Sequence, residues 1–208
     1  MPADLITLVP DANLEYALRG IYNRTESLGI RRMTFEIQRH YQRDPGCFKE
    51  GPDFLRYAHK KYCHAIIVMD YAGSGQENSM DSRQMEEDLC DRMNKSGWDG
   101  RCEAIVINPE LENWVWSESP HVGRVLGWKR PKCSLQDWLR SSNMQTEGSS
   151  KPGQPKEALE AVLRETKTPR SSIIYKQLAD RVSFKSCTDP AFRKLMETLN
   201  KWFPRKER

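Results

Sequence analysis

No apolar run in this sequence of 208 residues approaches the ~20 residues that a membrane-spanning helix needs. The opening residues, MPADLITLVP, lack the basic segment and the cleavage site of a secretory leader. The six cysteines are scattered, with no C-x-x-C pair and no short-spaced histidine, which argues against a zinc site or a disulfide framework. We therefore expect a cytoplasmic protein without a membrane segment, and we interpret its cysteines as mostly buried thiols.

Several common sequence motifs for nucleotide binding and catalysis are also missing. There is no P-loop, no G-x-G-x-x-G after a strand, no G-x-S-x-G elbow and no internal repeat. The net charge of +4 is mildly basic, so it permits contact with nucleic acid without demanding it. A hydrophobic content of 38% with 30% charged residues is typical of a globular protein with a well-solvated surface.

The most informative segment that is present runs from Cys63 to Gly75. Four consecutive apolar residues, Ile66 to Met69, precede Asp70 and a Gly-Ser-Gly turn, a pattern typical of a buried strand in a parallel sheet. Ligands of open α/β sheets bind at the carboxyl ends of the strands, so Asp70 would face a metal, a phosphate or a substrate. The alternative is that Asp70 only caps or turns the chain.

The rest of the chain alternates strands with helices. Further strands are expected at 5–9, 32–38 and 103–108, helices at 13–22, 52–61 and 81–94, a polar loop at 39–46, and a helix that starts at Pro109. This order predicts an α/β fold with a mainly parallel four-stranded sheet flanked by helices.

The chain divides into three parts. We assign 1–128 to the α/β domain and 129–155 to a linker with a short helix at 135–139, the stretch 141–154 being the mobile part. Three helices in 156–208 form a helical part that packs on the sheet domain, because about fifty residues make a marginal core alone.

Acidic residues follow three of the expected strands. They are Asp11 with Glu15, then Asp70, then Glu110 with Glu112. Hard oxygen ligands gathered at one sheet edge suit Mg²⁺ or Mn²⁺, which support phosphoryl transfer. The competing interpretations are that Asp11 only caps the helix after it, and that Glu15 and Glu112 are solvated helix residues.

Two groups of residues are candidates for phosphate binding. Arg39, His40 and Arg43 follow the second strand and could bind a phosphate near the acidic residues, although they could equally be ordinary loop residues. Gly73 and Ser74 form a turn after the central strand that could bind the phosphate of a nucleotide, but two glycines after a strand are also a common turn.

Short motifs carry a family resemblance. The run Val9 to Glu15, the strand Ile66 to Asp70 and the run Ile107 to Trp116 resemble, in their order, the motifs of small Toprim-like proteins of prokaryotic anti-phage defence loci. More narrowly, the chain is similar to a small subunit of the methylation-associated defence system. This similarity lies in the Pro109-to-Trp116 segment and in three further runs: Arg43 to Cys47, Ser119 to Val122 and Cys187 to Pro190. The resemblance covers most of the chain outside 141–154.

The resemblance implies a Toprim-like, Rossmann-like fold and a Mg²⁺-dependent nuclease that cleaves DNA or RNA. It places Asp11 at the first acidic position and Asp70 at the first position of an Asp-x-Asp, whose second position is Ala72 here. Glu77 or Glu112 could replace the missing carboxylate. On this hypothesis Asp11, Asp70 and Glu112 hold the metal.

Two other functions remain open. The chain could be a catalytically degenerate subunit that binds nucleic acid or docks onto other proteins of the defence locus, an alternative favoured by Ala72 and by Trp114, Trp116 and Trp128 as interface anchors. Those tryptophans could instead pack against the sheet. The third possibility is nucleotide sensing through the 73–75 turn.

Overall fold

A four-stranded parallel sheet forms the centre of the molecule. The computed structural model describes residues 2–117, 119–145, 148, 151–184 and 187–205. Its strands are β1 (Ala3–Val9), β2 (Phe35–Arg39), β3 (Tyr62–Asp70) and β4 (Cys102–Ile107). They lie in the order β2-β1-β3-β4, and every neighbouring pair is parallel. The expected α/β class with a parallel, Rossmann-like sheet is therefore confirmed.

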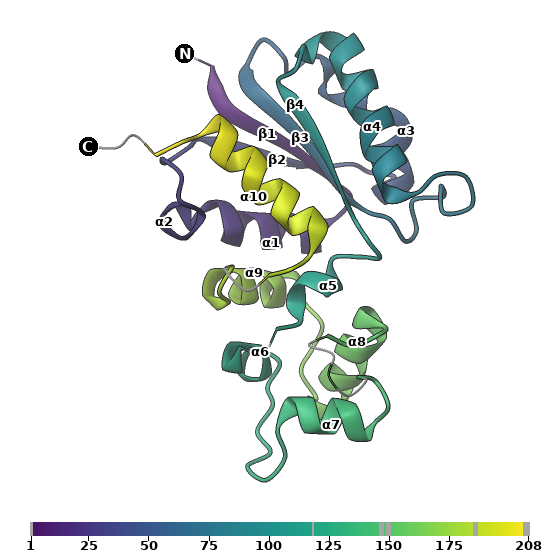
Figure 1. Ribbon diagram of the computed structural model, residues 1–208, viewed down its shortest axis with the longest axis vertical. Helices are drawn as coiled ribbons and strands as arrows, with labels where there is room; N and C mark the ends of the chain where they lie inside the picture. The colour runs from purple at the N-terminus through teal and green to yellow at the C-terminus, as the bar shows by residue number, and fades with distance from the viewer. Residues whose placement is uncertain (1, 118, 146–147, 149–150, 185–186, 206–208) are drawn as a thin grey trace.

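Helices cover both faces of the sheet, which is why its central strands are mostly apolar. On one face lie α3 (Arg43–Arg56), α4 (Ser82–Met93) and the π-helical turn η1 (Asn94–Trp98). The other face is covered by α1 (Ala12–Tyr22) and α10 (Pro190–Trp202) (Figure 1). Alternate residues of β3 enter the two cores: Ile66 and Val68 face α1 and α10, and Ile67 and Met69 face α3 and α4.

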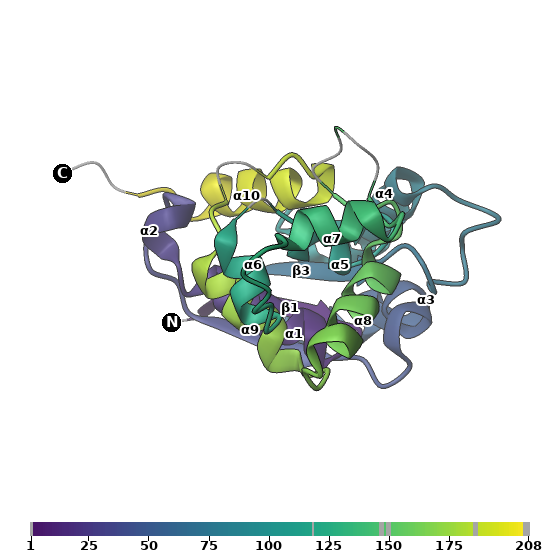
Figure 2. The ribbon, with the colours of Figure 1, turned by 90° about the horizontal axis from the view of Figure 1, so that it is seen from below.

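The remaining helices extend the core beyond the sheet. They are α2 (Thr25–Leu28), α5 (Glu112–Val115), α6 (Pro120–Val125), α7 (Leu135–Ser141), α8 (Pro155–Thr166) and α9 (Ser172–Arg181). The group α5–α8 lies beyond the carboxyl end of β4, and α9 lies beside α1 (Figures 1 and 2). Among the helices of the described residues, none has the length and apolar composition needed to cross a bilayer.

Two expectations about local structure are wrong. The polar loop expected at 39–46 ends early, because α3 begins at Arg43 and runs to Arg56 in place of the helix expected at 52–61. Pro45 is tolerated because it lies in the first turn, where a backbone N–H has no helical partner. Gly46 is required there, since a Cβ at this position would lie 2.0 Å from His40 Nδ1.

The helix expected from Pro109 starts later, at Glu112, and the Asn108–Pro109 peptide bond that precedes it is cis. The expected linker at 141–154 falls partly outside the described residues, at 146–147 and 149–150. In its described part, Gln145 and Pro152 are buried.

Candidate functional site

Asp70 lies where the sequence placed it, at the carboxyl end of the central strand and close to two loops. Its carboxylate Oδ1 accepts a hydrogen bond from the Leu111 N–H at 2.9 Å. Its own N–H donates to Oδ1 of Asp44 at 2.8 Å. The end of β3 is therefore joined both to the loop after β4 and to the first turn of α3, at the end of the sheet from which α5 continues (Figure 1).

Asp44 is the functional candidate that the sequence analysis missed. Burial raises the pKa of its carboxyl group to about 6, and the nearby charge of Asp11 adds to this shift. Hydrogen bonding to the Asp70 N–H and the charge of Arg43 act in the opposite direction. The available signal was topological: in a parallel sheet the segment after β2 ends at the same edge as those after β1 and β3.

Asp70 is in a still less favourable place for a negative charge. Burial raises the pKa of its carboxyl group well above the usual value, and the charges of Asp44, Glu112 and Asp11 raise it further. The main opposing influence is the Leu111 N–H. Several groups in the described part of the chain have a main influence on the pKa of Asp44 or Asp70. The one cationic side chain among them is Arg43, which lowers the pKa of Asp44.

Asp11 has a structural role as well as an electrostatic one. It is the N-cap of α1, and its Oδ1 accepts from the Leu14 N–H at 3.0 Å, so the capping interpretation is confirmed. It nevertheless lies close enough to raise the pKa of both Asp44 and Asp70. We refer to Asp11, Asp44 and Asp70 together as the aspartate cluster.

Glu15 and Glu112, the other two predicted catalytic residues, are engaged in ion pairs. Glu112 is 4% exposed and accepts from the Tyr175 hydroxyl at 2.5 Å and from Arg170 Nη2 at 3.2 Å. Glu15 accepts from Arg19 Nε at 2.9 Å, and its other oxygen is 3.2 Å from Arg39 Nε. Both carboxylates are thus compensated within the chain.

Glu110 and Glu77 also have partners within the chain. Glu110 pairs with Lys156 at 3.1 Å. Glu77, a candidate replacement for the carboxylate missing at Ala72, accepts from the Gly73 N–H instead.

The predicted metal triad of Asp11, Asp70 and Glu112 is not assembled. No three His, Cys, Asp or Glu side chains in the described ranges are grouped so that they could hold a metal ion. Mg²⁺, however, is often bound by one or two carboxylates, with water and substrate phosphate completing its coordination. The oxygen donors and the concentrated negative charge of Asp44 and Asp70 fit such an ion.

A broad hollow lies at the ends of β1 and β2, where Asp11 is the member of the aspartate cluster that lines it. Its space is about 860 Å³, and the residues that line it include Asp11, Glu15, Arg39, Tyr41 and Arg43. Arg39 and Arg43 are exposed at this surface. The hollow therefore combines carboxylates with guanidinium groups, as a site for a phosphate-bearing ligand requires.

His40 lines the same hollow but does not suit its predicted role in phosphate binding. The side chain is 2% exposed, stacks on Tyr41 with ring centroids 4.8 Å apart, and accepts from the Gln42 N–H through Nδ1 at 3.2 Å. Burial lowers the pKa of the ring below its usual value. Burial therefore favours the neutral ring, against the nearby charge of Glu50, and His40 packs as a structural residue.

The turn at 73–75 is occupied by its own contacts. Ser74 is fully buried, and its hydroxyl oxygen accepts from the Gln76 N–H at 3.2 Å. The Gly73 N–H donates to Glu77 Oε1 at 2.5 Å. Because these groups are already used, the turn offers little to the phosphate that the sequence analysis assigned to Gly73 and Ser74.

The three tryptophans suggested as interface anchors pack within the molecule. Trp116 is 4% exposed and donates to the Pro155 carbonyl. Trp114 packs edge-on against Phe192 and donates to Asp189, and Trp128 donates to the Cys133 carbonyl. All three therefore pack within the molecule, as the packing interpretation expected, but the partners in these contacts belong to helices and loops and not to the sheet that it named.

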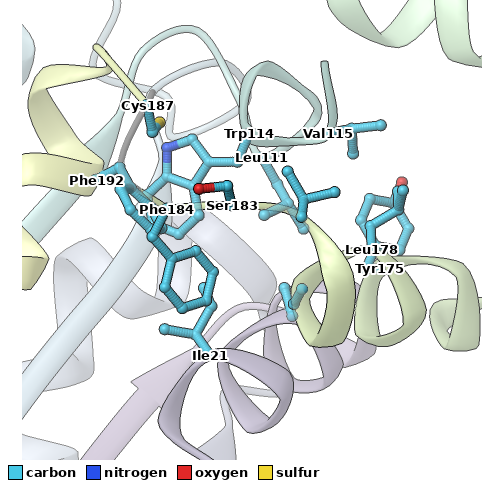
Figure 3. Close-up of a pocket in the computed structure, with 13 residues that line it drawn as sticks. Ile21, Leu111, Trp114, Val115, Tyr175, Leu178, Ser183, Phe184, Cys187 and Phe192 are labelled. Atoms are coloured by element: carbon cyan, nitrogen blue, oxygen red, sulfur yellow. The ribbon is translucent and has the colours of Figure 1, made fainter. Parts of the chain in front are cut away.

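A second pocket lies between α1, α5, α9 and the segment that leads into α10 (Figure 3). Apolar side chains line most of it, including Ile21, Trp114, Phe184 and Phe192. Its space of about 50 Å³ has room for only a few water molecules. The hollow beside the aspartate cluster is the better candidate for a substrate site.

No protein-family model matches the sequence, and no curated protein or solved structure matches it.

Proposed function

We propose that this chain is a Mg²⁺- or Mn²⁺-dependent nuclease of an anti-phage defence locus, acting on phosphodiester bonds of DNA or RNA at the hollow beside the aspartate cluster. The main support is the pair Asp44 and Asp70, two half-buried carboxylates at the same edge of the sheet. The charge of Asp44 raises the pKa of Asp70, and among the main influences on the pKa of either carboxyl group in the described residues the one cationic side chain is Arg43. Such groups either take up protons or attract a cation. The sequence resemblance points in the same direction.

Each residue at this edge has a role in the proposal. Asp44 and Asp70 provide oxygen ligands for a divalent ion, with Asp11 adding negative charge. Arg39 and Arg43 bind the phosphate that enters the hollow. The bound ion would supply an activated water molecule and offset the charge that develops on the phosphate.

A second candidate is a catalytically inactive subunit that binds nucleic acid or other proteins of the locus. One observation favours it: Ala72 supplies no carboxylate, and Glu112 is held by Tyr175 and Arg170. The acidic set is therefore smaller than the resemblance implies. In this candidate, the arginines of the hollow still bind nucleic acid, but no bond is cleaved.

The experiment combines cleavage with binding. Purified protein is incubated with single- and double-stranded DNA and RNA in Mg²⁺ or Mn²⁺, beside Asp70→Asn, Asp44→Asn and the exposed control Asp91→Asn. We expect both cluster variants to lose about 100-fold or more in cleavage rate and the control to lose little. Cleavage equal in all four proteins would contradict the proposal, and binding without any cleavage would support the second candidate.

A further inference from the structure

The two edge strands of the sheet, β4 and β2, differ in whether side chains occupy their outward backbone groups. In β4 the register with β3 turns the backbone groups of Ala104 and Val106 away from the sheet. These outward groups are occupied: Glu86 Oε1 accepts from the Val106 N–H at 2.8 Å, and Lys194 Nζ donates to the Ala104 carbonyl at 2.9 Å. Charged side chains therefore close the β4 edge against another strand.

The opposite edge, β2, has no such cover. The bonds from Leu5 N–H to the Thr34 carbonyl and from His40 N–H to the Val9 carbonyl fix the register with β1. In that register the N–H and C=O groups of Phe35, Ile37 and Arg39 point outward. No strand pairs with this side of β2 in the described part of the chain, and no described side chain bonds to those outward groups.

We propose that β2 is a self-association edge, at which two copies of this chain pair their β2 strands antiparallel about a two-fold axis through Ile37. Antiparallel strands bond through alternate residues, and Phe35, Ile37 and Arg39 are the alternate residues that point outward. In this register, Phe35 and Ile37 bond to Arg39 and Ile37 of the second copy. The two sheets then form one continuous sheet, and the interface is the same patch on both copies.

The side chains of β2 fit this pairing. Glu36 lies opposite Gln38 of the second copy, so no two like charges meet across the strand pair. On the other sheet face, Arg39 lies opposite Phe35 of the second copy, so no second cation faces it. In this register no position of the β2 strand places like charges opposite each other, so the strand is compatible with a second copy of itself.

The first test measures self-association by sedimentation equilibrium of the full chain, from micromolar to submillimolar concentration. We expect a monomer–dimer equilibrium. Gln38→Glu would place two pairs of carboxylates opposite each other and weaken the dimer about tenfold. Gln38→Lys would place a lysine opposite Glu36 and strengthen it. A monomer at every concentration, or the reverse order of these two variants, overturns the proposal.

The second test separates backbone pairing from side-chain effects. Arg39→Pro removes an outward N–H without breaking a bond to β1, and Arg39→Ala removes the same side chain while keeping that N–H. The proposal expects a monomer for Arg39→Pro and a dimer for Arg39→Ala. A dimer that both variants leave intact, or that both abolish, contradicts pairing through the β2 backbone. If circular dichroism shows that Arg39→Pro is unfolded, the Gln38 variants decide the outcome.

Discussion

Two sets of buried or half-buried carboxylates are held in opposite ways in this molecule. The paired glutamates, Glu86, Glu110 and Glu112, each have a cationic partner: Lys194, Lys156 and Arg170, respectively. For Asp44 and Asp70 in the aspartate cluster, the one cationic side chain among the main influences within the described residues is Arg43, which acts on Asp44. Burial raises the pKa of Glu86 and Glu110 too, but in each case a lysine opposes the shift.

The difference separates carboxylates that have an ion-pair partner from carboxylates that lack one in the described structure. The partners of the paired glutamates all come from the last third of the chain, so these ion pairs attach the C-terminal part to α4, to the loop after β4 and to α5. The aspartate cluster attaches nothing of that kind. A negative charge on Asp44 or Asp70 costs stability, which is the basis for proposing a ligand at this cluster.

The largest expected effect is on stability, from removing the partner of a paired glutamate. Arg170→Met leaves Glu112 buried with one hydrogen bond from Tyr175, and we expect the free energy of unfolding to fall by about 3 kcal/mol. Urea denaturation at pH 7 measures this change. Adding Glu112→Gln should restore most of the loss. If the single variant is as stable as the parent, the ion pair is not structural.

In the aspartate cluster, removing a charge is expected to raise the free energy of unfolding. The pKa of Asp44 is raised to about 6, so the folded state binds more protons than the unfolded state between about pH 4 and pH 6, and stability falls as the pH rises through that window. Above it, the ionised carboxylate costs stability. Asp44→Asn should therefore raise the free energy of unfolding by about 2 kcal/mol at pH 8 and by little at pH 4. Equal effects at both pH values would refute this account.

A smaller effect is expected from a divalent ion. Mg²⁺ at about ten times its dissociation constant would add about 1.4 kcal/mol to the free energy of unfolding, which is about 3 °C in melting temperature for a chain of this size. Differential scanning fluorimetry should show this shift in the parent and in Glu110→Gln, and no shift in Asp44→Asn. A shift retained by Asp44→Asn would place the ion elsewhere.

The smallest expected effect is a loss of stability at Asp189, a carboxylate that belongs to neither set. Asp189 is 4% exposed, and it is held by N–H groups of Asn113, Trp114 and Phe192. Trp114→Phe removes one of these donors, and we expect a loss of about 1 kcal/mol in urea denaturation. A loss of several kcal/mol would show that Asp189 depends on Trp114 as strongly as Glu112 depends on Arg170.

The sequence predicts the sheet better than it predicts the site. Apolar runs of four or more residues locate β3 and β4, and a run interrupted by Thr7 locates β1, because a strand buried on both faces needs a nearly continuous apolar segment. The predicted start of α3 was wrong because Pro45 and Gly46 are typical loop residues. In the structure, the first turn of the helix accepts the proline, and the close contact with His40 requires the glycine.

The composition of the site depends on contacts between distant segments. Asp44 reaches Asp70 across 26 residues, and Tyr175 reaches Glu112 across 63. No local pattern marks either contact. The sequence could therefore identify candidate carboxylates at the sheet edge, but it could not say which of them would be neutralised by a partner from a distant helix.

The packing of α9 on α1 has a consequence for synthesis of the chain. These helices are close neighbours in space, yet α1 ends at Tyr22 and α9 begins only at Ser172 (Figure 2). Because the chain is synthesised from the N-terminus onward, the apolar face of α1 stays partly uncovered until most of the polypeptide has been translated. We expect nascent chains that end before Ser172 to be retained by chaperones, which ribosome-associated pull-down of stalled chains would measure.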